Sequence, residues 1–266
     1  MTEGRGALEF VVLGSGTFTP GRPPEGPGRG GVRNPAGYAL RCQDEILLFD
    51  LGFGNFRQMV RAGLDPDRVS SVFLSHRHPD HTGDLAALLF YYRYDGKPQG
   101  KRLRVCGPRG TAGFVERLFR AHHPWLRPRG FDLKLETLEE GSVVRGSGWR
   151  VLCREVPHTT ESLAYRFEAK EGSLCYTGDT SWDPGLARFA AGADLLVSEC
   201  ALADGERGEG HLRVSEALEL GRLSGARQVL LTHLSPASER GLAAALRGKR
   251  RFRRAEDLMR IRVSRY

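Results

Sequence analysis

The 266-residue sequence lacks several features that would assign it to a class directly. It has no run of about 18 apolar residues, which a membrane-spanning helix needs, and its first residues contain no apolar secretion signal. Cysteine is scarce, and its five residues are scattered without any C-x-x-C pair. These absences argue against a membrane span and a disulfide scaffold. We therefore expect a cytoplasmic protein with reduced thiols.

The composition is uniform along the chain, without a linker rich in glycine or serine. We therefore expect a single domain over residues 1–266, and the 40% hydrophobic content is adequate for its core. The net charge of +8 comes mainly from arginine, which suits a phosphate-bearing partner, either a small molecule or a nucleic acid. Codon bias explains the arginines equally well, so charge alone decides little. Association into a homodimer stays open.

Ligand-type side chains crowd into one short segment. Three imidazoles and a carboxylate occupy positions 76 to 81, directly after the apolar run Val72–Leu74, which predicts a buried strand. A loop at the end of that strand can point His76 and His78 to one side, and Asp80 and His81 to the other. Imidazole and carboxylate together suit Zn²⁺, Mn²⁺ or Fe. The alternative is a polar surface loop that is rich in histidine.

The pattern His-x-His-x-Asp-His resembles the signature of the metallo-β-lactamase superfamily. That family needs three further ligands in a fixed order: a histidine, a bridging aspartate and a last histidine. His158, Asp179 and His233 occur in this order, each where a short β-like run ends. A lone histidine after a strand is more often structural, but the complete order favours a shared metal centre.

The resemblance implies an α/β (α+β) fold, the four-layer αββα sandwich of that superfamily. Strands that come in bursts early and alternate with helices later agree with this layering. Among them, residues 131–156 are expected to hold two or three antiparallel strands, and Ala164–Phe167 and Leu174–Tyr176 to pair across a turn at 170–172.

The resemblance also implies two divalent ions, with Zn²⁺ expected and Mn²⁺ or Fe as alternatives. His76, His78 and His158 would bind one ion, Asp80, His81 and His233 the other, and Asp179 would bridge them. Two such ions can share a hydroxide at neutral pH and polarise a substrate oxygen. Asp80 is expected to orient that hydroxide as well. Asp50, at the end of an apolar run, is a candidate for orienting a metal-bound imidazole, or else a turn residue before Gly52.

His211 resembles a catalytic histidine of ribonuclease Z and related phosphodiesterases that is not a metal ligand. Glu199 occupies the place of a glutamate that supports this histidine there. An imidazolium beside a carboxylate is a suitable general acid for a leaving oxygen. The alternative is a surface histidine that merely precedes a helix. The loop Gly14–Thr17 is similar to the opening of ribonuclease Z, and its backbone N–H groups are expected to be able to meet phosphate.

One departure from ribonuclease Z concerns chain length. Only 20 residues separate His158 from Asp179, where that enzyme usually carries a long arm that grips transfer RNA. A hairpin fills this interval, which favours a small or cyclic phosphodiester over precursor transfer RNA. We therefore predict a dinuclear phosphodiesterase acting on a small or cyclic phosphodiester or on RNA. The alternatives are another hydrolase of the scaffold, such as a thioesterase or lactonase, and a mononuclear iron oxidoreductase.

Overall fold

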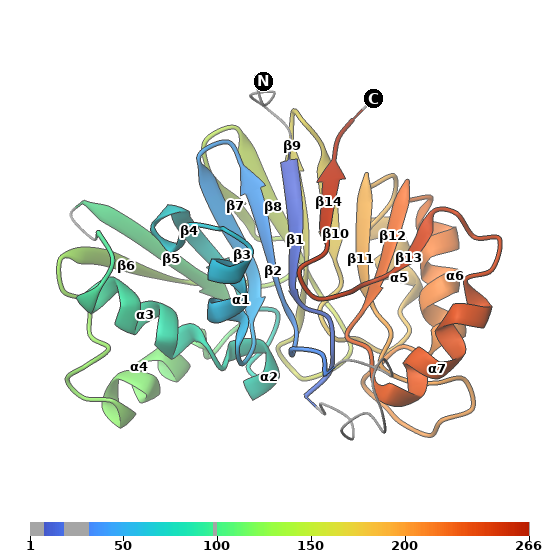
Figure 1. The fold of residues 1–266 in the computed structure, drawn as a ribbon, viewed down its shortest axis with the longest axis horizontal. Helices are drawn as coiled ribbons and strands as arrows, with labels where there is room; N and C mark the ends of the chain where they lie inside the picture. The colour runs from blue at the N-terminus through green and yellow to red at the C-terminus, as the bar shows by residue number, and fades with distance from the viewer. Residues whose placement is uncertain (1–7, 19–31, 98–99, 266) are drawn as a thin grey trace.

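Two seven-stranded sheets face each other in the computed structural model, which describes residues 8–18, 32–97 and 100–265 (Figure 1). The first sheet has the order β14-β1-β2-β3-β4-β5-β6, and the second has the order β13-β12-β11-β10-β9-β8-β7. The strands of the first sheet are β1 (Leu8–Gly14), β2 (Gly37–Cys42), β3 (Glu45–Leu51), β4 (Val69–Phe73), β5 (Lys101–Gly107), β6 (Phe131–Thr137) and β14 (Arg260–Val263). Those of the second are β7 (Val143–Arg145), β8 (Trp149–Glu155), β9 (Leu163–Ala169), β10 (Ser173–Tyr176), β11 (Leu195–Glu199), β12 (Gln228–Thr232) and β13 (Phe252–Arg254).

Helices cover the outer face of each sheet (Figure 1). On the first sheet lie α1 (Asn55–Arg61), α3 (Leu85–Tyr94) and α4 (Thr111–Ala121), and on the second lie α5 (Pro184–Phe189), α6 (Val214–Ser224) and α7 (Pro236–Ala245). The short α2 (Pro79–Thr82) and the 3-10 turn Pro66–Arg68 complete the set in the described residues. The predicted αββα layering is confirmed. No helix in the described part of the chain is long and apolar enough to cross a bilayer.

The central core lies between the two sheets and is rich in aromatic rings. Tyr38 and Tyr176 have ring centroids 5.0 Å apart, and Phe73 lies 5.5 Å from Tyr165 on the opposite sheet. These side chains are completely or almost completely buried because alternate residues of each strand point inward. Each such burial contributes about 1.5–3 kcal/mol before losses of entropy. Separate apolar clusters join each sheet to its helices.

The expectation of two or three antiparallel strands over residues 131–156 is confirmed for two strands and wrong for a third. Residues 131–156 do not form a single antiparallel group, because β6 pairs with β5 in parallel in the first sheet, while β7 and β8 form an antiparallel pair in the second. The crossover through α4 permits the parallel pairing. The pattern of apolar residues along a strand indicates which of its residues are buried. It does not indicate which strand is its neighbour in the sheet. The β9–β10 hairpin, in contrast, is antiparallel as predicted.

The strand directions bring several loops to one end of the molecule. β10, β11 and β12 are parallel to one another, and β3 is parallel to β4, so the carboxyl ends of each group lie together. β8 points the same way as β10, since both pair antiparallel with β9. The candidate residues follow the ends of these strands. Figure 1 shows this end at the bottom, near α2, and the two termini at the top.

Candidate metal centre

All seven candidate metal ligands lie together at this end. Two of the three groups with ligand atoms within 4.8 Å of one another contain them all: His76, His78, His158 and Asp179 in the first, and Asp80, His81 and His233 in the second. The first four positions of the motif come from the first sheet, and His158, Asp179 and His233 come from the second. These groups contain the residues of the two expected ligand sets, and the ligand assignment itself stays a prediction. Which residue binds which ion stays a proposal.

Asp179 occupies the middle of the cluster. Its Oδ2 lies 3.1 Å from His81 Nε2 and 3.3 Å from His233 Nε2. The same oxygen lies 3.8 Å from Nε2 of both His76 and His158. Burial alone would raise the pKa of Asp179, but the imidazoles of His233 and His81 lower it well below its usual value. The carboxylate is therefore ionised and touches both groups.

The donor atoms fit a divalent cation. His76 Nε2, His81 Nε2 and Asp179 Oδ1 are buried and have no hydrogen-bond partner in the structure. Each unsatisfied buried polar atom costs about 1–3 kcal/mol, a cost that a shared cation removes. Burial also lowers the pKa of His76 and lowers that of His233 to about 4, which favours the neutral imidazole that binds metals. The cluster is thus suited to divalent metal.

Hydrogen bonds orient the histidine rings toward the cluster. His158 Nδ1 lies 2.6 Å from the Gly210 carbonyl, which only accepts, so this nitrogen carries the proton and Nε2, 3.3 Å from His78 Nδ1, faces the cluster. His81 Nδ1 lies 2.7 Å from Asp50 Oδ2 in the same arrangement. Asp50, completely buried, also accepts bonds from the Ser75 backbone and hydroxyl and from the Tyr176 hydroxyl, at 2.6–2.7 Å. The orienting role considered for Asp50 is the one that the geometry supports.

We expect Asp50→Asn to weaken metal binding about 10–100-fold, because an amide cannot accept all the bonds that hold His81 in place. Competition with a chromogenic chelator measures the affinity. Asp194→Asn is a matched control, since Asp194 is also buried and accepts two bonds from Ser173, at the opposite end of β10. That variant should lose stability and keep its metal affinity. Equal affinity losses in both variants would argue against a specific role for Asp50.

His211 and Glu199 form a pair at the rim of the cluster. His211 Nδ1 lies 3.0 Å from Glu199 Oε1 and 3.9 Å from Asp179 Oδ2. The histidine side chain is 26% exposed, whereas that of Glu199 is 1% exposed and accepts backbone bonds from Thr180 and Ala201. Burial raises the pKa of Glu199 to about 7. Burial alone would lower the pKa of His211, but its bond to Glu199 raises it to about 9. At neutral pH the imidazole is therefore protonated.

The expectation that the Gly14–Thr17 loop offers backbone N–H groups to phosphate is wrong for three of its residues. The N–H of Ser15 donates to Asp257, that of Gly16 to the Asn34 carbonyl, and that of Thr17 to the Leu234 carbonyl. These bonds tie the loop to other segments. A glycine-rich sequence alone does not reveal that its amides already have partners.

Sequence reasoning missed Tyr176, which was expected only as a strand residue. Its hydroxyl lies 2.6 Å from Asp50 Oδ2 and is completely buried with it. A tyrosine in an otherwise apolar strand just before Asp179 is the signal that could have found it, because a buried hydroxyl needs a partner.

Comparison with known proteins places these features in a family. A family model described as the β-lactamase superfamily domain matches residues 46–234, which is more than half of the chain. The chain belongs to this superfamily. Among relatives in the superfamily, the Ribonuclease Z of Methanothermobacter thermautotrophicus is 27% identical over 314 aligned positions, covering 97% of this chain and 98% of that protein. The Ribonuclease Z of Thermococcus gammatolerans is 28% identical, covering 85% and 83%.

Solved structures of the superfamily show the same fold. The metallo-β-lactamase fold protein YhfI from Bacillus subtilis has a TM-score of 0.77 and 21% identity, covering 97% of this chain and 99% of that one. The short form of human tRNase Z has a TM-score of 0.75 and 24% identity, covering 97% and 100%. A diphosphatase of the PhnP family has a TM-score of 0.76 and 18% identity, with the same coverages.

Proposed function

We propose that this member of the β-lactamase superfamily is a metal-dependent hydrolase of phosphodiesters that holds two divalent ions. The observation that carries the proposal is the His211–Glu199 pair beside the ligand cluster, 3.0 Å apart and set next to Asp179. A protonated imidazole at this place suits the departure of an alkoxide from phosphate. The relatives named Ribonuclease Z support the same class of reaction.

The candidate ligands would hold two metal ions. His76, His78 and His158 would hold one ion, Asp80, His81 and His233 the other, with Asp179 between them, and Zn²⁺ suits this donor set best. When bound, such ions supply Lewis acidity and make hydroxide available near neutral pH. Asp80, whose side chain is 12% exposed, would also orient the attacking water by accepting a hydrogen bond from it.

His211 gives its proton to the leaving oxygen, and Glu199 fixes the ring. Because Glu199 accepts a hydrogen bond from Nδ1–H of His211, Nε2 of His211 is the nitrogen that faces the substrate. The buried carboxylate touches no substrate, so Glu199 is a positioning residue. It also keeps the imidazole charged at neutral pH, as a general acid requires.

The short interval between His158 and Asp179 bears on the substrate. In the structure it holds a loop and the β9–β10 hairpin, which turns at residues 170–172. The alignment with the Methanothermobacter relative spans 314 positions, which exceeds the 266 residues of this chain by 48, so that relative carries segments that are absent here. Small and cyclic phosphodiesters and RNA strands are the substrates to test, and association into a homodimer stays a prediction.

A panel of substrates tests the function. Protein reconstituted with Zn²⁺ or Mn²⁺ is offered an aryl phosphodiester, a cyclic nucleotide, an RNA oligonucleotide, a thioester and a β-lactam. We expect turnover of at least one phosphodiester, and its loss when the metal is removed by a chelator. Turnover of the thioester or the lactam alone would replace the proposal by another hydrolase. Oxygen consumption with Fe²⁺ and no hydrolysis would favour an oxidoreductase.

A further inference from the structure

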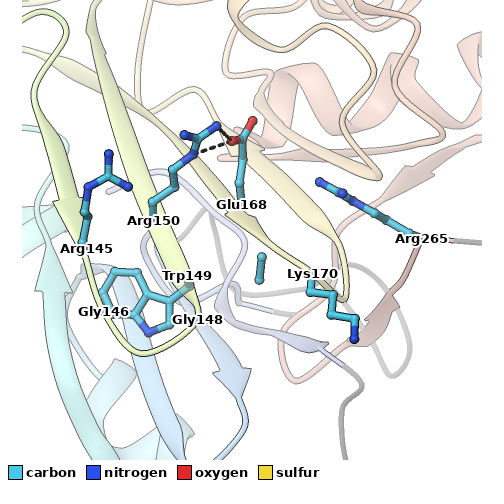
Figure 2. A pocket seen from close by; sticks show the side chains of 9 residues that line it. Arg145, Gly146, Gly148, Trp149, Arg150, Glu168, Lys170 and Arg265 are labelled. Carbon is cyan, nitrogen blue, oxygen red and sulfur yellow. Dashed lines mark hydrogen bonds and ion pairs between the residues drawn. The ribbon is translucent and has the colours of Figure 1, made fainter.

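An open surface pocket lies at the end of the second sheet that is opposite the metal centre. This distal basic site has a volume of about 450 Å³ and is lined by residues 145, 146, 148–150, 168–170 and Arg265 (Figure 2). Trp149 begins β8 whereas His158 follows its end, and Lys170 precedes β10 whereas Asp179 follows it. Because a strand rises about 3.3 Å per residue, β8 separates the distal basic site from the metal centre by roughly 20 Å.

The lining is strongly basic. Among the described residues, its charged side chains are one carboxylate, Glu168, and four exposed cations, Arg145, Arg150, Lys170 and Arg265. Glu168 is already compensated, since it pairs with Arg150 at 2.6 Å and with Arg166 at 2.8 Å. In the described part of the chain, no carboxylate pairs with Arg145, Lys170 or Arg265. Three side chains of the lining therefore carry a positive charge without a carboxylate partner among the described residues.

The backbone that presents these cations is fixed. The Arg104 guanidinium donates to the Arg145 carbonyl at 2.9 Å and lies 5.6 Å from the centre of the Trp149 ring. On the other side, the N–H of Arg265 donates to the Glu171 carbonyl at 2.8 Å, which ties the C-terminal segment to the β9–β10 turn. A ligand that bridges these turns finds them already in place, so less entropy is lost on binding.

The chemistry of the distal basic site suits phosphate without a base. Arginine and lysine are the side chains that neutralise phosphates, and arginine also binds them through two parallel hydrogen bonds. Trp149, the only aromatic residue of the lining among the residues that the structure describes, is 5% exposed and its indole N–H donates to Glu45. It therefore offers no open face on which a base could stack. A nucleic-acid backbone fits such a surface better than a free nucleotide does.

The outer face of β8 and β9 connects this surface with the metal centre. Arg150 lies beside Glu168 in the strand register, and Leu152 lies beside Arg166. Arg154, further along β8 toward His158, pairs with Asp183 at 2.7 Å. Arginines therefore line the route, but those between the two sites have carboxylate partners. Along this face, the described cations without a carboxylate partner lie at the distal basic site.

We propose that the distal basic site binds the phosphates of an RNA strand whose scissile phosphodiester lies in the metal centre. This inference rests on the proposed function and deepens it, because it shifts the preferred substrate from a small phosphodiester to a strand that spans both sites. Arg145, Lys170 and Arg265 make the contacts, and none of them belongs to the catalytic machinery.

The triple variant Arg145→Ala, Lys170→Ala and Arg265→Ala tests the proposal. For an RNA oligonucleotide long enough to reach both sites, we expect KM to rise roughly tenfold. The slope of log affinity against log salt should fall by about 2, since each phosphate contact of a single strand contributes about 0.7. Turnover of an aryl phosphodiester, which is too short to reach the distal basic site, should stay within about twofold of wild type.

A control variant removes the same charge elsewhere. Arg102→Ala, Arg117→Ala and Arg120→Ala change three exposed arginines of β5 and α4, in the layers of the first sheet. An equal rise in KM for both triple variants, or no rise in the first, would overturn the proposal, because position would then not matter. Fluorescence anisotropy with a labelled RNA oligonucleotide compares the same two variants without turnover.

The experiment separates failure of this inference from failure of the proposed function. If the metal-loaded wild type hydrolyses neither RNA nor the aryl phosphodiester, the function is refuted, and the anisotropy comparison still decides whether the distal basic site binds RNA. If the triple variant also loses aryl phosphodiester turnover, Lys170→Gln at the exposed turn replaces it. Unchanged RNA affinity in Lys170→Gln and in Arg145→Gln would then reject the proposal.

Discussion

Asp179→Ala should lose both bound metal and phosphodiester hydrolysis. Its carboxylate lies within 3.1–3.9 Å of five histidines, and its side chain is 2% exposed. Removing it leaves those imidazoles without their central negative charge and breaks the link between the two ligand groups. Because metal ions contribute several kcal/mol to transition-state stabilisation, we expect turnover to fall on the order of a thousandfold. Elemental analysis of the purified variant measures the metal content.

Asp183→Ala is the matched control for this experiment. Asp183 follows Asp179 in the same loop, but it caps α5 and pairs with Arg154 instead of facing the cluster. This variant should keep its metal and most of its turnover. Wild-type metal content and rate in Asp179→Ala would show that the central carboxylate is dispensable and that the ligand assignment is wrong.

His211→Ala should retain metal and lose phosphodiester turnover by about a hundredfold to ten-thousandfold, the usual contribution of a general acid. The loss should depend on the leaving group. A ribose oxygen needs a proton as it departs, whereas a nitrophenolate departs without one. The deficit should therefore be large with an RNA strand and small with a nitrophenyl phosphodiester.

The pH profile gives an independent measurement of the same role. The rate requires protonated His211, so it should fall as the pH rises through the pKa of this residue. Without metal, Glu199 raises the pKa of His211 to about 9. Bound metal ions would lower this pKa, because they repel the imidazolium. The alkaline fall is therefore expected below pH 9 in the loaded protein. It should vanish in His211→Ala and move to lower pH in Glu199→Gln.

Two outcomes would contradict the acid role. Asp179, His211 and His233 also form a group with metal-ligand spacing. Loss of one equivalent of metal in His211→Ala would make this histidine a ligand instead. An equal deficit for good and poor leaving groups would make it a residue that binds substrate. His122→Ala, at an exposed histidine after α4, is the control and should behave as wild type.

Most of the candidate centre could be located from the sequence because the candidate ligands follow strand ends. His76, His158 and His233 each follow shortly after an apolar run. The carboxyl ends of parallel strands lie at the same edge of a sheet, so residues that follow them come together. The layering could be predicted for the same reason. Asp50 was found as the polar end of a buried strand, although its four hydrogen bonds could not be foreseen.

Other features depend on contacts between segments that are remote in sequence. The partner of β6 is chosen by the α4 crossover, which apolar patterning does not report. The amide of Ser15 is taken by Asp257, 242 positions away. The distal basic site likewise assembles Arg145, Lys170 and Arg265 from three separate segments, so only the folded chain reveals that they share one surface.

The position of the β9–β10 turn determines where this architecture can accept additional residues. His158 and Asp179 lie at one end of the hairpin that separates them, and the turn at residues 170–172 lies at the other. Surface turns tolerate inserted residues when the backbone on either side keeps its hydrogen bonds. Extra chain added at this turn would lengthen the protein and leave both ligands in place. A protein of this architecture could therefore gain or lose chain at this turn without a change at its candidate metal centre.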